Sequence, residues 1–270
     1  MPIRSAASAT VKVPEAMPSE AATIIVLKKT KLGETDLIVT GFSAAGRQVR
    51  AVAKGGRKPG SRTGAHLELF CVSEVLLGKG RNLDVVSEAR ILDANLGCRQ
   101  DVEHSAAAGA VVELLDKVSQ DGTVEERLFA MAREALRCIG SVEIGGLELS
   151  CAAALLKIAA QIGLCPELGA CAVCGATTDG GDTPVFLDIP QGGIICQQCR
   201  HEHPYTQQPL ISKELRLWLC NLLSLRFSDL EPYATGKYQP LGRQCLQIAQ
   251  QWLSCHLNLS LKSLDFLLTS

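Results

Sequence analysis

The sequence has few aromatic residues and none of the short motifs that mark common enzyme classes. Phe, Trp and Tyr together make up 4% of its 270 residues, so stacking of nucleic-acid bases on aromatic rings can contribute little. GxxxxGK followed by Ser or Thr, GxSxG, HExxH and a GxGxxG after a strand are all absent. Their absence argues against an ATPase or hydrolase. We therefore expect a protein that is not an enzyme.

The sequence also lacks the hydrophobic segments that direct a chain into or across a membrane. Hydrophobic residues form 47% of it, but no uninterrupted apolar run is long enough to span a bilayer. Residues 1–20 contain three prolines and two glutamates and no apolar core of a secretory signal. We expect a cytoplasmic protein, without a membrane partner, whose residues 1–20 form a flexible extension.

Charge is distributed unevenly along the chain. The net charge is −1, but residues 1–62 carry 11 Lys and Arg against 4 Asp and Glu, whereas residues 63–270 carry 16 against 24. The first part is therefore +7 and the remainder −8. Because a binding surface depends on local charge, the N-terminal part is expected to bind an anionic partner.

The N-terminal part has the pattern of short β-strands. Runs of β-branched and alternating residues occur at 23–27, 36–42, 48–53, 67–77 and 82–92, separated by turn residues. Five strands in about 70 residues are typical of a small Greek-key barrel. We predict a five-stranded OB-fold over 21–93, and an SH3-like barrel fits nearly as well.

The remainder of the chain, 94–270, is predicted to be mostly helical. Its apolar residues recur with the helical period, and glycines follow several of these segments. Helices are expected over 102–118, with Asp101 as the N-cap, and over 123–139, 147–162, 212–227 and 242–257. The fold class is therefore α+β, with a β-barrel followed by a helical domain.

Four of the twelve cysteines form two Cys-x-x-Cys pairs. Cys171 and Cys174 are separated by 21 residues from Cys196 and Cys199. One tight turn can direct both sulfurs of a pair to a common point, and two such turns complete the tetrahedral set that zinc prefers. We predict one structural zinc ion in a zinc finger inserted at 168–203.

Two alternatives to this ligand set involve neighbouring residues and redox chemistry. His201 or His203 could replace one cysteine, and a Cys-x-x-Cys pair could exchange thiols with a disulfide. The other eight cysteines lie singly, mostly in apolar patterns, and are expected to be reduced side chains of the core.

Basic residues gather near the predicted strands of the barrel and in the loop K-G-G-R-K-P-G-S-R that starts at Lys54. A flexible cationic loop can bind phosphates with little dependence on base sequence. The candidate DNA-binding residues are Lys28, Lys29, Arg47, Arg50, Lys54, Arg57, Lys58 and Arg62.

Several of these segments, in this order, resemble the bacterial RecO family of recombination mediators. The resemblance rests on G-E-T-D at 33–36, the basic loop, the pairs C-A-V-C-G and C-Q-Q-C, and L-K-S-L-D-F-L at 261–267. It implies a protein that binds single- and double-stranded DNA, anneals complementary strands, and acts in repair with RecR and the C-terminal tail of single-strand-binding protein to load RecA. The competing hypothesis is an adaptor that acts through its helical domain with little direct DNA binding.

Overall fold

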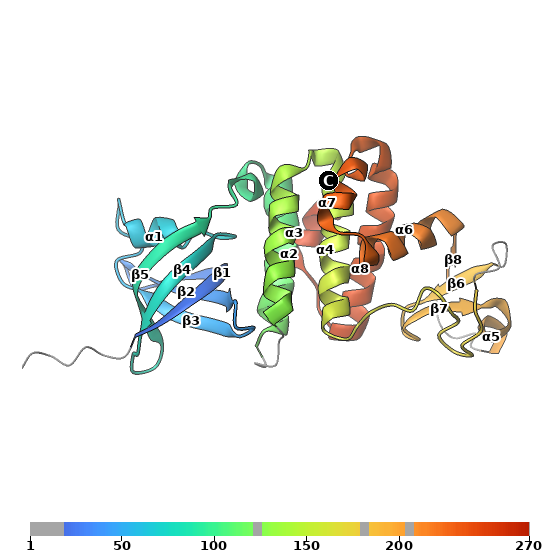
Figure 1. The fold of residues 1–270 in the computed structure, drawn as a ribbon, viewed down its shortest axis with the longest axis horizontal. Coiled ribbons are helices and arrows are strands. Elements are labelled where there is room, and N and C mark those ends of the chain that lie inside the picture. Colours follow the sequence, from blue (N-terminus) through green and yellow to red (C-terminus); the bar gives the residue numbers. More distant parts are fainter. Residues whose placement is uncertain (1–18, 121–125, 179–183, 203–207, 270) are drawn as a thin grey trace, which may run out of the picture.

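The computed structural model describes residues 19–120, 126–178, 184–202 and 208–269. Figure 1 shows a β-barrel at one end, a group of helices in the middle and a small β-sheet at the opposite end. The predicted extension, 1–20, lies outside the described residues except for its last two, which begin the first strand.

The barrel is closed and consists of five strands in the order β1-β2-β3-β5-β4. Strands β3 and β5 pair in parallel, and the short helix α1 (Arg62–His66) lies between β3 and β4. This arrangement confirms the predicted OB-fold. The strands are β1 (Ser19–Leu32), β2 (Asp36–Ser43), β3 (Gln48–Ala53), β4 (Val72–Gly78) and β5 (Asp84–Asp93).

Strand β1 is much longer than the predicted segment 23–27. Its first half pairs with β4 and its second half with β2, so it closes the barrel. A register shift between Val26 and Lys28 bends the strand where these two pairings meet. The part of β1 after residue 27 was not predicted, because the three lysines at 28, 29 and 31 interrupt the apolar pattern from which strands are predicted.

The helical domain surrounds one buried helix, α4 (Leu147–Gln161), which contacts α2, α3, α6 and α8. The other helices are α2 (Val102–Val118), α3 (Glu126–Ser141), α5 (Gln197–Glu202), α6 (Lys213–Ser224), α7 (Phe227–Leu230), α8 (Gln239–Leu257) and α9 (Lys262–Thr269). Short 3-10 turns occupy Leu96–Arg99, Ile144–Gly146, Glu231–Tyr233 and Gly236–Tyr238.

One described segment, Ile144–Gln161, is long and apolar enough by composition to cross a membrane, and 78% of it is buried inside the protein. Its two charged residues are both engaged within the fold. Arg243 Nε donates to Glu148 Oε1 at 2.8 Å, and Lys157 Nζ donates to Leu225 O at 2.6 Å. These contacts are those of a core helix, because each buried charge has a partner inside the protein.

The barrel and the helices share one hydrophobic core. Ile25, Leu27 and Phe42 point outward from the barrel and pack against the helical domain. The ring of Phe42 lies 6.2 Å from that of Phe129 in α3, and Gln48 Nε2 donates to the backbone oxygen of Asp116 in α2 at 3.1 Å. The seam between the domains is therefore packed and hydrogen-bonded.

Asp101 caps helix α2 as predicted, and it also holds a buried histidine. Its carboxylate accepts from His104 N at 2.7 Å and lies 2.7 Å from His104 Nδ1. Burial raises the pKa of Asp101, but these hydrogen bonds outweigh burial and hold the pKa below its usual value. The cap therefore contributes stability when the carboxylate is ionised.

Replacement of Asp101 by Ala should lower the free energy of unfolding by about 1–2 kcal/mol near neutral pH, the usual cost of a lost N-cap. The contribution is present above the unfolded pKa of about 3.9 and is lost as the pH falls through the lower folded value. Urea denaturation at several pH values measures it. Glu134→Ala, at an exposed carboxylate on α3, is the control, and an equal loss in both variants would contradict the role of the cap.

Candidate metal centre and nucleic-acid interface

The four cysteines of the two pairs converge at the end of the molecule opposite the barrel. Their sulfurs all lie within 4.8 Å of one another, and those of Cys174 and Cys196 are 3.9 Å apart. In a tetrahedral site with metal–sulfur distances of about 2.3 Å, neighbouring sulfurs lie about 3.8 Å apart. The cluster could therefore hold a metal ion after only small adjustments of the side chains.

Tight turns and one short hairpin bring the sulfurs together. Gly175 has φ +72°, and its N–H donates to Cys171 O at 2.8 Å, which closes the first turn. Strand β7 (Gly193–Cys196) pairs with β6 (Val185–Asp188) and ends at Cys196, and helix α5 then carries Cys199. A third strand, β8 (Leu210–Ile211), completes the sheet beside β6.

The thiols differ in their electrostatic environment. Burial raises the pKa of Cys171, but backbone N–H groups directed at its sulfur, including that of Cys196 at 3.4 Å, lower the pKa to about 6. Burial and the neighbouring thiols raise the pKa of Cys199. Several thiolates so close together repel one another, and a divalent cation would remove that repulsion. The donor set fits a metal ion that prefers sulfur ligands.

The metal-binding segment is fastened to the helical domain by Arg216 of α6. Its Nε donates to Leu168 O at 2.8 Å and its Nη1 donates to Thr178 O at 3.0 Å. In addition, Ile194 of β7 belongs to the main hydrophobic core. His201 is exposed and lies outside the sulfur cluster, while His203 lies outside the described residues.

The basic loop lies against the turn between β1 and β2. Arg57 N donates to Thr35 O and Arg57 Nη1 donates to Gly33 O, both at 2.8 Å. The carboxylate of Asp36 accepts from Gly55 N at 2.8 Å, and this bond, followed by one from Thr35 and the charges of nearby lysines, lowers its pKa. The G-E-T-D and K-G-G-R segments therefore form one surface, which their separation in sequence does not reveal.

The eight predicted DNA-binding residues fall into three groups. Lys29 Nζ lies 2.6 Å from Glu68, and Arg47 forms an ion pair with Glu20, so these two charges are partly neutralised. Arg57 is exposed but fastens the loop. The remaining five are exposed and make no ion pair with any described residue: Lys28, Arg50, Lys54, Lys58 and Arg62.

Comparison with known proteins identifies both parts of the chain. The family model "Recombination protein O N terminal" matches residues 17–95, and "Recombination protein O C terminal" matches residues 99–265. A DNA repair protein RecO of Desulforamulus reducens is 30% identical over 249 residues, which are 90% of this chain and 91% of that protein. A DNA repair protein RecO of Alkaliphilus metalliredigens is 30% identical over 234 residues, 86% of this chain and 92% of that protein.

The OB barrel with its basic loop, the helical domain with its four-cysteine segment and the two family matches together define a protein of the DNA repair class. The chain belongs to the RecO family of DNA repair proteins. The predicted family and the predicted fold class are thus both confirmed.

The conformation of the basic loop depends on close contact between two glycines. A Cβ atom on Gly64 of α1 would lie 2.0 Å from Gly56 O. Gly64→Ala should therefore displace the loop and cost about 1–3 kcal/mol, as overpacking does. Thermal unfolding and limited proteolysis within 54–61 measure both effects. Gly236→Ala is the control, because space is open at that position, and a variant Gly64→Ala that resists protease like wild type would contradict this account.

Proposed function

We propose that this chain is a DNA-binding, strand-annealing recombination mediator without catalytic activity. The observation that supports it most directly is the basic loop, whose backbone is fastened to the β1–β2 turn while Lys54 and Lys58 extend into solvent. A preformed cationic surface loses little conformational entropy when it binds phosphates. Neutralised phosphates release counterions, so binding is expected to depend steeply on salt and weakly on sequence.

Charge neutralisation also explains how such a surface could promote annealing. Two complementary strands repel each other through their phosphates, and a cationic protein surface reduces that repulsion while base pairing supplies the specificity. This process requires no covalent step and no open metal position. Single- and double-stranded DNA are therefore both expected ligands of the barrel.

The four-cysteine cluster is proposed to hold one structural zinc ion, bound by Cys171, Cys174, Cys196 and Cys199. Four sulfur ligands complete a tetrahedron and leave no position for water or substrate. The ion would hold the two turns together at the far end of the helical domain. We also propose the domain division 21–93 and 94–270, with the zinc finger at 168–203.

The family resemblance extends this proposal to partners and location. The chain is expected to act in the bacterial cytoplasm, associated with the nucleoid, with RecR and the C-terminal tail of single-strand-binding protein. Together they would load RecA on single-stranded DNA. These contacts are proposed from the family resemblance.

Anisotropy of a fluorescein-labelled oligothymidylate, titrated with protein over a range of salt concentrations, tests the DNA-binding role. Wild type should bind with a steep negative dependence on salt, and Lys54→Ala and Lys58→Ala should each flatten the slope by about 0.7, the value for one phosphate contact on a single strand. Lys213→Ala, at an exposed lysine of α6, is the matched control. A response independent of salt in wild type would favour the adaptor hypothesis.

Metal analysis of the purified protein tests the zinc site. One zinc per chain is expected in wild type and none in Cys171→Ser, with a lower melting temperature in the variant because metal binding contributes to folding. Cys255→Ser is the control, because Cys255 is exposed and outside the cluster. A wild-type protein without metal that reduces a disulfide substrate would instead support thiol exchange.

A further inference from the structure

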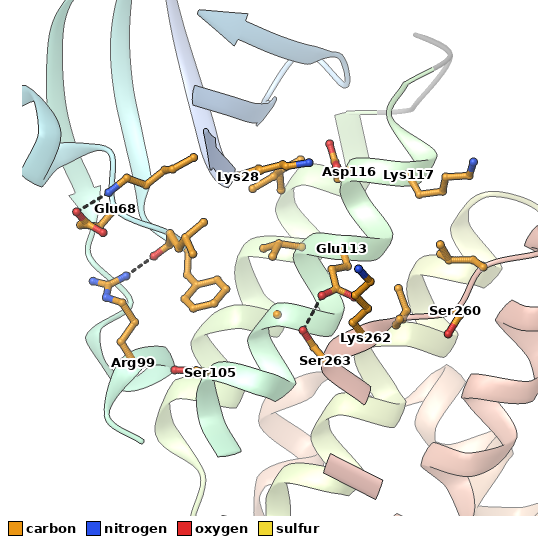
Figure 2. A pocket seen from close by; sticks show the side chains of 18 of the residues that line it. Lys28, Glu68, Arg99, Ser105, Glu113, Asp116, Lys117, Ser260, Lys262 and Ser263 are labelled. Carbon is orange, nitrogen blue, oxygen red and sulfur yellow. Dashed lines mark hydrogen bonds and ion pairs between the residues drawn. The ribbon is translucent and has the colours of Figure 1, made fainter. Parts of the chain in front are cut away.

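A groove of about 840 Å³ lies between the barrel and the helical domain (Figure 2). Residues 27–29 of β1, one side of α2 and the segment that leads into α9 line it. Part of its apolar floor is covered, since Phe70 is 4% exposed and Leu261 is 1% exposed, while Leu69 and Leu259 are half-buried. Lys28, Lys117 and Lys262 at its rim are all exposed.

Cations outnumber carboxylates around this groove. Its lining residues include Lys28, Lys29, Arg99, Lys117 and Lys262 against Glu68, Glu113 and Asp116. Lys29 Nζ lies 2.6 Å from Glu68 Oε1, whereas Glu113 and Asp116 accept hydrogen bonds from the neutral groups Ser263 Oγ and Gln48 Nε2, at 2.7 Å and 3.0 Å. By contrast, none of the rim lysines forms an ion pair with any residue that the structure describes. The rim is a cationic patch that belongs largely to the helical domain.

Strand β1 connects this rim to the basic loop. Lys28 lies on the groove, and five residues further along the same strand and its turn Gly33 accepts the hydrogen bond from Arg57 of the loop. At about 3.3 Å per residue, the two places are roughly 17 Å apart along the strand. Lys31 is exposed between them, on the opposite face of the strand from Lys28, because successive side chains of a strand alternate. The strand therefore connects the groove to the basic loop, with cations on both of its faces.

We propose that a single DNA strand bound to the basic loop continues along β1 into this groove, where Lys117 and Lys262 contact its phosphates. This proposal rests on the proposed DNA-binding function and extends it from the barrel to two residues of the helical domain. Phe70 is the only aromatic among the lining residues of the described chain, and it is buried. Contacts in the groove are therefore to the backbone and do not read sequence.

A protein segment is the other class of occupant. An acidic peptide could satisfy the lysines and place an apolar side chain against Leu69 and Leu259, which are half-buried. Exposed rim lysines that form no ion pair among the described residues, on a groove that shares strand β1 with the basic loop, favour a phosphate chain.

The test compares Lys117→Ala, Lys262→Ala and the double variant in the full chain, with Lys213→Ala as the control. An oligothymidylate of about 30 nucleotides exceeds the roughly 4–16 that one OB fold occupies, whereas one of about 6 nucleotides can be bound by the barrel alone. With the long strand, each single variant should flatten the salt slope by about 0.7 and the double variant by about 1.4. With the short strand, all three should bind as wild type does.

The outcomes separate this proposal from the proposed function. If all three variants keep the wild-type salt slope on the long strand while Lys54→Ala flattens it, DNA does not bind in the groove but still binds the barrel. If wild type itself shows no salt dependence, both the groove proposal and the proposed DNA-binding function are contradicted. Binding of a labelled poly-aspartate peptide that depends on Lys117 and Lys262, with DNA binding unchanged, would assign the groove to an acidic protein segment instead. Lys→Arg at both positions should restore the slope, and thermal unfolding checks that each variant is folded.

Discussion

The packing of the outer face of the barrel on helices α2 and α3 is the interaction on which the other surfaces depend. Ile25, Leu27 and Phe42 leave the interior of the barrel and enter the core of the helical domain. An OB barrel alone would be a small domain that buries little surface on folding. Sharing a core with the helices increases the apolar surface that it buries. Because the seam is packed and hydrogen-bonded, the groove beside it has a defined shape.

The two ends of the molecule use different means to hold irregular backbone in place. At the barrel, Asp36 and Arg57 fasten the basic loop with hydrogen bonds, so the chain can present several like charges in one place. At the other end a small sheet is anchored by Arg216 and by a few core residues. Its own core is small and consists of Phe186 and Ile195 packed with Cys171 and Cys199 of the sulfur cluster, so the proposed metal ion would add stability that so short a segment otherwise lacks. The polar loop requires no such ligand because α1 and the β1–β2 turn support it.

Much of the fold could be predicted from sequence because its signals are local. Asp101 caps α2 as expected, α6 begins within the predicted segment 212–227, where Ser212 caps it, and two Cys-x-x-Cys pairs place four sulfurs together. Long-range features could not be predicted in this way. Three of them depend on the tertiary fold: the length of β1, the ion pairs of Lys29 and Arg47, and the contact between the G-E-T-D turn and the basic loop. Cys165 and Cys255 were expected in the core but are exposed, because an apolar helical pattern does not show where a helix end leaves the core.

The distribution of charge gives the groove its particular significance. Residues 94–270 carry 13 Lys and Arg against 19 Asp and Glu, a net −6, so most of the helical domain would repel a phosphate chain. Lys117 lies in the last turn of α2, where a cation also favours the helix dipole. Lys262 is the first residue of α9, where a cation opposes the dipole by about 0.3–1 kcal/mol. Helix stability therefore favours the first lysine and not the second, and contact with the proposed phosphate chain would offset the unfavourable position of Lys262 at the start of α9.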